Sequence, residues 1–100
     1  MKLIECEEVM LFSGTVLRFK DEYEEYVDFM LCEYPCVDEK YCPVALYCVS
    51  GYDAGHIEYV FPSEAKFENN WKCISTEWLV KNWNKRVYSQ CRGDKIEVII

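Results

Sequence analysis

Apolar and polar residues alternate along the first part of the chain with the two-residue period that is typical of half-buried strands. Residues 9–12 form a short apolar run, and Ser13-Gly14 follows as a turn signal. In residues 15–19, Leu17 and Phe19 share one side while polar or shorter residues occupy the other. We therefore expect strands over residues 9–12 and 15–19.

Residues 24–34 fit two periods, and both remain open at this point. As a strand, the segment would turn Val27, Phe29 and Leu31 toward one side. As a helix, it would place the acidic residues 21–25 at its N-terminus, where the helix dipole stabilises negative charge. We favour the strand, because β-branched and aromatic residues are common in it. A turn at residues 20–22 would pair it with 15–19 as a hairpin.

A second hairpin is predicted in the middle of the chain. Residues 44–50 and 57–61 are mainly apolar, and the glycine-bounded loop 51–55 between them has the composition of a tight turn. After it, Ser63 could cap one helical turn over residues 63–66.

The clearest helix signal covers residues 75–86. Ser75 is a favourable N-cap, and Ile74 and Leu79 occupy the positions of a hydrophobic staple. Trp78 and Trp83 lie about 140° apart around a helix, so we expect one in the core and the other at its rim. Residues 96–100 would close the chain as a strand.

These elements predict one α+β domain over residues 1–100. We expect a mainly antiparallel sheet of five to six strands, with one principal helix over about residues 75–86 packed on one face. The length fits one domain and leaves little mass for a deep substrate cleft.

The distribution of charge along the chain is more informative about function than the overall composition is. The net charge is −7, and the first 40 residues carry all of this excess, with four basic and eleven acidic residues. Such a chain is a poor direct binder of nucleic acid, whose phosphates require Lys and Arg. Solvated carboxylates explain individual acidic pairs, but tyrosines interleave with them and tyrosine is an interface anchor. We predict a partner-binding surface formed by Asp21, Glu22, Tyr23, Glu24, Glu25, Tyr26, Asp28, Glu33, Asp38 and Glu39.

Seven cysteines offer an alternative function as a small metal or redox module. The candidate ligands are Cys32, Cys36, Cys42 and Cys48, but their spacing lacks the paired knuckles of zinc sites. We expect reduced thiols, no metal and no cofactor.

Catalysis and membrane insertion are both disfavoured. The single histidine, His56, lies in a predicted loop with Asp53 and near Cys48, and no catalytic motif surrounds it. We therefore expect no enzymatic activity. The longest apolar run has six residues, and Lys2 and Glu5 interrupt the start of the chain before a targeting segment can form. We expect a cytoplasmic protein with no membrane contact.

Several segments resemble one family of small bacterial proteins. The segments are residues 51–55, 61–65, 74–85 and 87–88, and the most specific stretch is Trp78-Leu79-x-x-Asn82-Trp83. They are similar to immunity protein family 45, which is associated with polymorphic toxins and contact-dependent inhibition. The resemblance implies a non-enzymatic protein that binds one cognate toxin, often a nuclease. A basic nuclease domain would accept carboxylates in place of phosphates.

Overall fold

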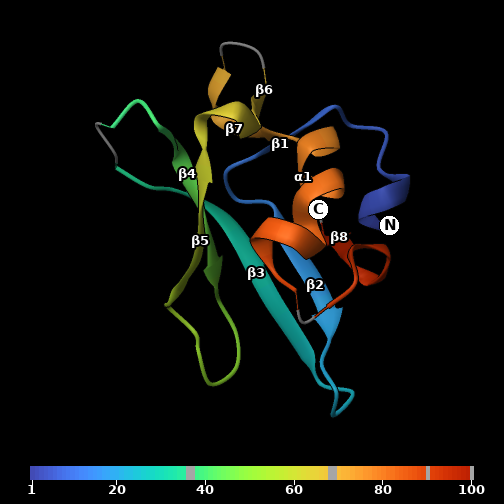
Figure 1. The fold of residues 1–100 in the computed structure, drawn as a ribbon. Helices are drawn as coiled ribbons and strands as arrows, with labels where there is room; N and C mark the ends of the chain where they lie inside the picture. Colours follow the sequence, from blue (N-terminus) through green and yellow to red (C-terminus); the bar gives the residue numbers. More distant parts are fainter. Residues whose placement is uncertain (36–37, 68–69, 90, 100) are drawn as a thin grey trace.

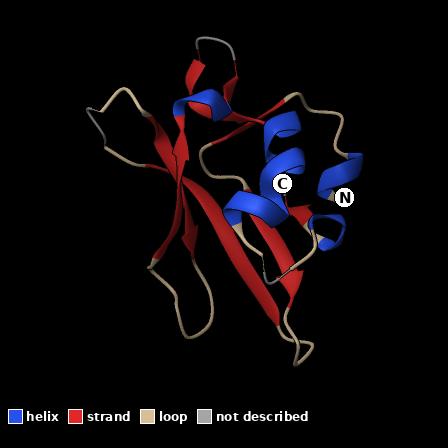
Figure 2. Cartoon of the chain, viewed as in Figure 1, coloured by secondary structure: helices blue, strands red, loops and turns tan. Residues whose placement is uncertain are grey.

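The structure, a computed structural model, describes residues 1–35, 38–67, 70–89 and 91–99, with the backbone alone at residues 70 and 71. Within this part of the chain, eight strands form two antiparallel sheets (Figures 1 and 2). The five-stranded sheet has the order β5(Ile57–Pro62), β4(Tyr41–Cys48), β3(Tyr26–Glu33), β2(Val16–Lys20), β8(Glu97–Ile99). The three-stranded sheet has the order β1(Met10–Phe12), β7(Asn70–Ser75), β6(Lys66–Phe67).

Helical segments cover one face of the larger sheet. The main helix consists of α1(Thr76–Asn82) and the π-helical turn η3(Trp83–Val87). Three short 3₁₀ turns complete the fold: η1(Leu3–Glu5), η2(Ser63–Ala65) and η4(Gly93–Lys95). The predicted α+β architecture with one principal helix is confirmed. The strands exceed the predicted five to six because the two-residue β6 and the irregular β7 form a second sheet with β1.

The central hairpin joins β2 and β3, so residues 26–33 form the favoured strand and not the alternative helix. Leu17 lies opposite Phe29 in the register, and both are buried. Side chains on this face form the core with Leu31, Leu46 and other buried residues. The two-residue alternation thus separates a core face from an outer face.

The second hairpin joins β4 and β5, also as predicted. β4 begins at Tyr41, three residues earlier than expected, and continues through Pro43. The register between β4 and β5 shifts between Tyr41 and Ala45. A proline fits a strand at such an irregularity, because no regular ladder hydrogen bond is required there.

The main helix begins where the sequence predicts. The Ser75 hydroxyl accepts a hydrogen bond from the Trp78 backbone N–H at 3.2 Å. Trp83 is fully buried, and its indole N–H donates to the Cys91 carbonyl at 3.1 Å, whereas Trp78 is half-buried. This confirms the expected core and rim positions of the two tryptophans. The predicted cap at Ser63 is wrong: Pro62 precedes the turn and no side chain caps it.

Candidate functional site

An acidic turn connects β2 to β3 and is organised by one of its own carboxylates. Asp21 accepts hydrogen bonds from the backbone N–H groups of Tyr23 at 2.8 Å and Glu25 at 3.0 Å. Glu24 has a φ angle of 62°, a left-handed conformation that is uncommon for a side chain of this kind. The turn is therefore a defined structure that fixes where its acidic side chains point.

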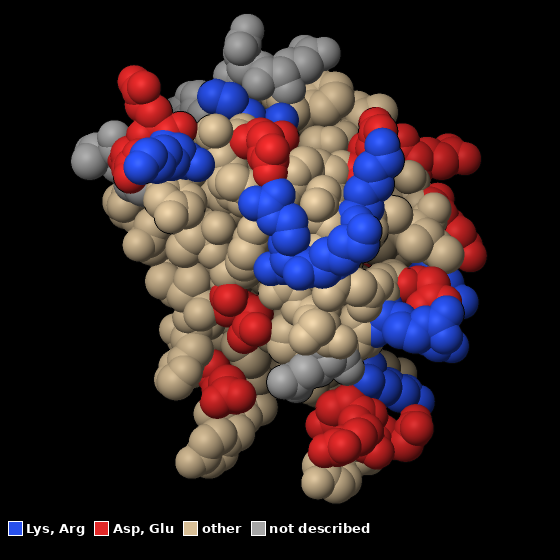
Figure 3. Space-filling view, in the orientation of Figure 1, with Lys and Arg blue, Asp and Glu red and all other residues tan. Residues whose placement is uncertain are grey.

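A groove of about 820 Å³ lies between this turn and the loop from β4 to β5. Both segments project from the same end of the molecule (Figure 1). Figure 3 shows acidic side chains on both projections, which form the lower end of the view. We call this feature the acidic groove. Its five carboxylates belong to Asp21, Glu22, Glu25, Asp53 and Glu58, and none of its described lining residues is Lys or Arg.

Aromatic side chains form the base of the acidic groove. The rings of Phe19, Phe29 and Tyr88 all line it, and their centroids lie 5.1–5.4 Å from one another. Burial raises the pKa of Tyr88, and the negative charge of Glu58 raises it further. Phe19 and Phe29 are almost completely buried, so the base is rigid and belongs to the core.

The two carboxylates from β5 and its preceding loop repel one another. Burial raises the pKa of Glu58, and the nearby charge of Asp53 adds to this effect. Like charges held together in a partly desolvated site favour a cation between them. The negative potential of the acidic groove therefore favours a positively charged side chain from a binding partner.

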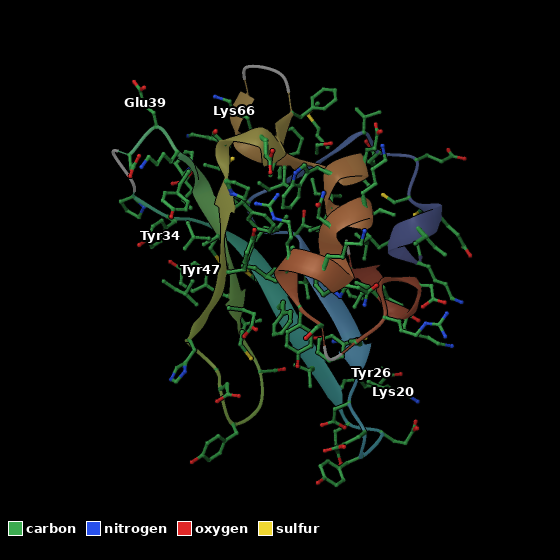
Figure 4. All side chains as sticks on the ribbon, viewed as in Figure 1. Lys20, Tyr26, Tyr34, Glu39, Tyr47 and Lys66 are labelled. Carbon is green, nitrogen blue, oxygen red and sulfur yellow. The ribbon has the colours of Figure 1, made fainter. Side chains whose placement is uncertain are left out.

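The other side of the β2–β3 turn has a different character. Asp28 accepts hydrogen bonds from the Arg18 guanidinium at 2.8 and 3.1 Å, and Glu24 lies 3.7 Å from Lys20. Tyr26 carries both cations over its ring, with Arg18 at 5.1 Å and Lys20 at 5.3 Å from the centroid. Figure 4 labels Lys20 and Tyr26 beside one another at this end. These acidic residues already have cationic partners.

The remaining predicted residues lie at the opposite end of β3. Glu33 is 3.6 Å from Lys72, and Asp38 accepts a hydrogen bond from the Lys40 backbone N–H at 2.9 Å. Figure 4 places Glu39 in the loop at this far end. An eight-residue strand spans about 25 Å, so the ten predicted residues do not form one surface.

The structure divides the predicted set into three groups. Asp21, Glu22, Tyr23, Glu25 and Tyr26 line the acidic groove. Of these, Asp21, Glu22 and Tyr26 also border the other side of the turn, together with Arg18 and Lys20. Glu24 forms an ion pair with Lys20 on the other side of the turn. Asp28 forms one with Arg18 on the outer face of β3. The third group is Glu33, Asp38 and Glu39.

Sequence reasoning placed neither Glu58 nor Tyr88 at the site, and it considered Asp53 only as a catalytic group. These residues reach the groove from segments distant in the sequence. A signal was nevertheless present, because the resemblance segments 51–55 and 87–88 contain Asp53 and Tyr88.

The cysteines of the alternative module do not converge. Cys42 and Cys48 are buried on the core face, whereas Cys32 lies on the opposite face of β3. Burial raises the pKa values of Cys32 and Cys42, which opposes formation of metal-binding thiolates. Cys36 lies outside the described residues. Among the residues that are described, no three His, Cys, Asp or Glu side chains are placed to hold a metal ion.

His56 and Cys48 are paired through the backbone, where the Cys48 N–H donates to the His56 carbonyl at 2.9 Å, but their side chains differ in exposure. His56 is exposed at the end of the β4–β5 loop. Cys48 is buried, and its thiol donates to the Ser50 carbonyl at 3.1 Å. No helix in the described part of the chain is long and apolar enough to cross a membrane.

Comparison with known proteins adds one finding. The family model described as immunity protein 45 matches residues 3–98, which include every element that lines the acidic groove. Neither the curated proteins nor the solved structures contain a match to the chain.

Proposed function

Because the chain belongs to the immunity protein 45 family, we propose that it binds and neutralises a cognate toxin. The acidic groove is the proposed contact surface. The carboxylates would attract a toxin with a basic surface over a distance. The exposed Tyr23 and Tyr52, which line the groove, offer apolar contact after docking.

The proposed toxin is a nuclease domain delivered by contact-dependent inhibition and met in the cytoplasm. A nuclease must present Lys and Arg to phosphate. Carboxylates on both walls of the acidic groove can accept hydrogen bonds from the same side chains. The protein thereby occupies the surface that nucleic acid would need, and inhibition requires no enzymatic activity of its own.

The observation that carries this proposal is the arrangement of charge around the acidic groove. Five carboxylates from three segments line one hollow, and its described lining contains no Lys or Arg. Partial burial and, to a smaller extent, the charge of Asp53 make ionised Glu58 unfavourable in the free protein. A bound cation would offset that cost.

Two neighbouring charge reversals test the proposal. Glu25 lines the acidic groove, whereas Glu24 lies beside Lys20 on the other side of the turn. Glu25→Lys and Glu24→Lys change the net charge equally. We expect Glu25→Lys to slow association with the toxin domain by about tenfold at low salt and to flatten its salt dependence. Glu24→Lys should have a clearly smaller effect.

Stopped-flow association rates at several salt concentrations, with toxin activity assayed in parallel, give the measurement. Equal effects of the two substitutions would show that the groove has no special role. If wild-type protein leaves the toxin active, neutralisation itself is wrong.

A further inference from the structure

The outer face of the five-stranded sheet, opposite the main helix, carries an uncharged patch. One row crosses all five strands through paired positions: Ile99, Val16, Met30, Tyr47 and Ile57. A second row consists of Cys32, Ala45 and Val60. Tyr34 and Pro43 lie next along β3 and β4, where the Tyr34 N–H donates to the Pro43 carbonyl. We call these ten residues the outer patch.

The pattern of this face is unusual for a sheet exposed to water. An antiparallel sheet with one solvated face normally places polar side chains there. Here the polar row is confined to one end, where Arg18 lies between Asp28 and Glu97. In the outer patch, Ile57 is 44% exposed, Val16, Met30 and Tyr47 are half-buried, and Ala45 is fully buried beneath its neighbours. Figure 4 shows Tyr34 and Tyr47 pointing to the side of β4 away from the main helix.

The uncharged composition of the outer patch favours a second copy of this chain over a basic toxin. A basic toxin surface would bury Lys and Arg against it with no carboxylate to pair with, at a high desolvation cost. A second copy brings an equally uncharged, tyrosine-rich face, and two sheets can stack face to face about 10 Å apart. The five carboxylates of the acidic groove lie on the other side of the sheet, with the core aromatics.

The size of the outer patch is compatible with a weak dimer. Only the first row crosses all five strands, and the second and third rows hold three and two residues. At about 4.8 Å between strands and about 6.8 Å between rows, the ten positions cover roughly 330 Å² per copy. This is below the area of stable interfaces, so the expected association is weak. We propose that two copies of this chain associate through their outer patches, in a two-fold dimer that leaves both acidic grooves open. This proposal is independent of the toxin.

Sedimentation of the protein alone tests the dimer at concentrations up to about 200 µM, which covers micromolar affinities. We expect a monomer–dimer equilibrium that salt strengthens, because salt screens the repulsion between two chains of charge −7. Toxin association should have the opposite salt dependence. Wild-type protein that stays monomeric at every concentration and salt would overturn the proposal.

A matched pair of substitutions locates the interface. Ile57 lies in the outer patch, whereas Ile4 in η1 has a similar exposure of 50% outside it. Because a two-fold interface repeats each residue, Ile57→Lys should weaken dimerisation at least about 30-fold. Ile4→Lys should leave it within twofold. Equal behaviour of the two variants would contradict the assignment.

A second variant keeps the test valid if Ile57→Lys folds poorly. Tyr47→Arg should likewise abolish the dimer, with circular dichroism as the check of folding. A folded Tyr47→Arg protein that still dimerises would exclude the outer patch. Loss of toxin binding in Tyr47→Arg, with a monomeric wild type, would assign the patch to the toxin and overturn self-association.

Discussion

At the scale of single residues, Glu58 shows how the acidic groove affects the stability of the free protein. Burial and the charge of Asp53 raise its pKa. The folded chain therefore holds this proton more tightly than the unfolded chain does. The free energy of unfolding should consequently fall as the pH rises from the ordinary carboxyl value, about 4.3, through the raised pKa.

Glu58→Gln should remove this pH-dependent loss and stabilise the free protein slightly near neutral pH. Chemical denaturation at several pH values measures the free energy of unfolding of the wild type and the variant. Glu77 provides a control of opposite sign, because its hydrogen bond with Lys81 lowers its pKa. Glu77→Gln should remove a contribution that is present near neutral pH and is lost as the pH falls through the lowered pKa. If both variants shift the pH profile in the same direction, the assigned electrostatics are wrong.

At the scale of elements, the start of the main helix depends on one hydroxyl. Ser75 caps α1, which has only seven residues before the π-helical turn. We expect Ser75→Ala to lower the free energy of unfolding by about 1 kcal/mol. Ser63→Ala is the matched control, since Ser63 makes no capping bond. Its effect should stay within about 0.5 kcal/mol. Equal losses in urea denaturation would contradict the capping assignment.

Elements were predictable where one local signal determined them. β2 and β3 each have one buried face, so alternation identified the strands and a short turn paired them. β7 could not be found in this way, because consecutive residues Cys73 and Ile74 are both fully buried and the alternation disappears. β6 has two residues and carries no periodic signal.

The candidate site was less predictable than the elements. The sequence indicated acidic tyrosine-containing segments but contained no information on their distance in space. Folding separates Glu33 and Glu39 from the β2–β3 turn by the length of β3, and brings Glu58 and Tyr88 to it. These placements follow from sheet order and helix docking, which depend on contacts between distant segments.

At the scale of the whole molecule, the total charge and its location make different predictions for toxin capture. Glu25→Lys raises the net charge from −7 to −5, and Lys40→Glu restores −7 by moving the negative charge to the far end of β3. If total charge governs capture, the double variant should associate at the wild-type rate. Because steering depends on the local potential at the contact surface, we expect the double variant to remain about as slow as Glu25→Lys alone. Stopped-flow rates at low salt distinguish these outcomes, and Lys40→Glu alone serves as the control. Recovery of the wild-type rate in the double variant would place the steering field outside the acidic groove.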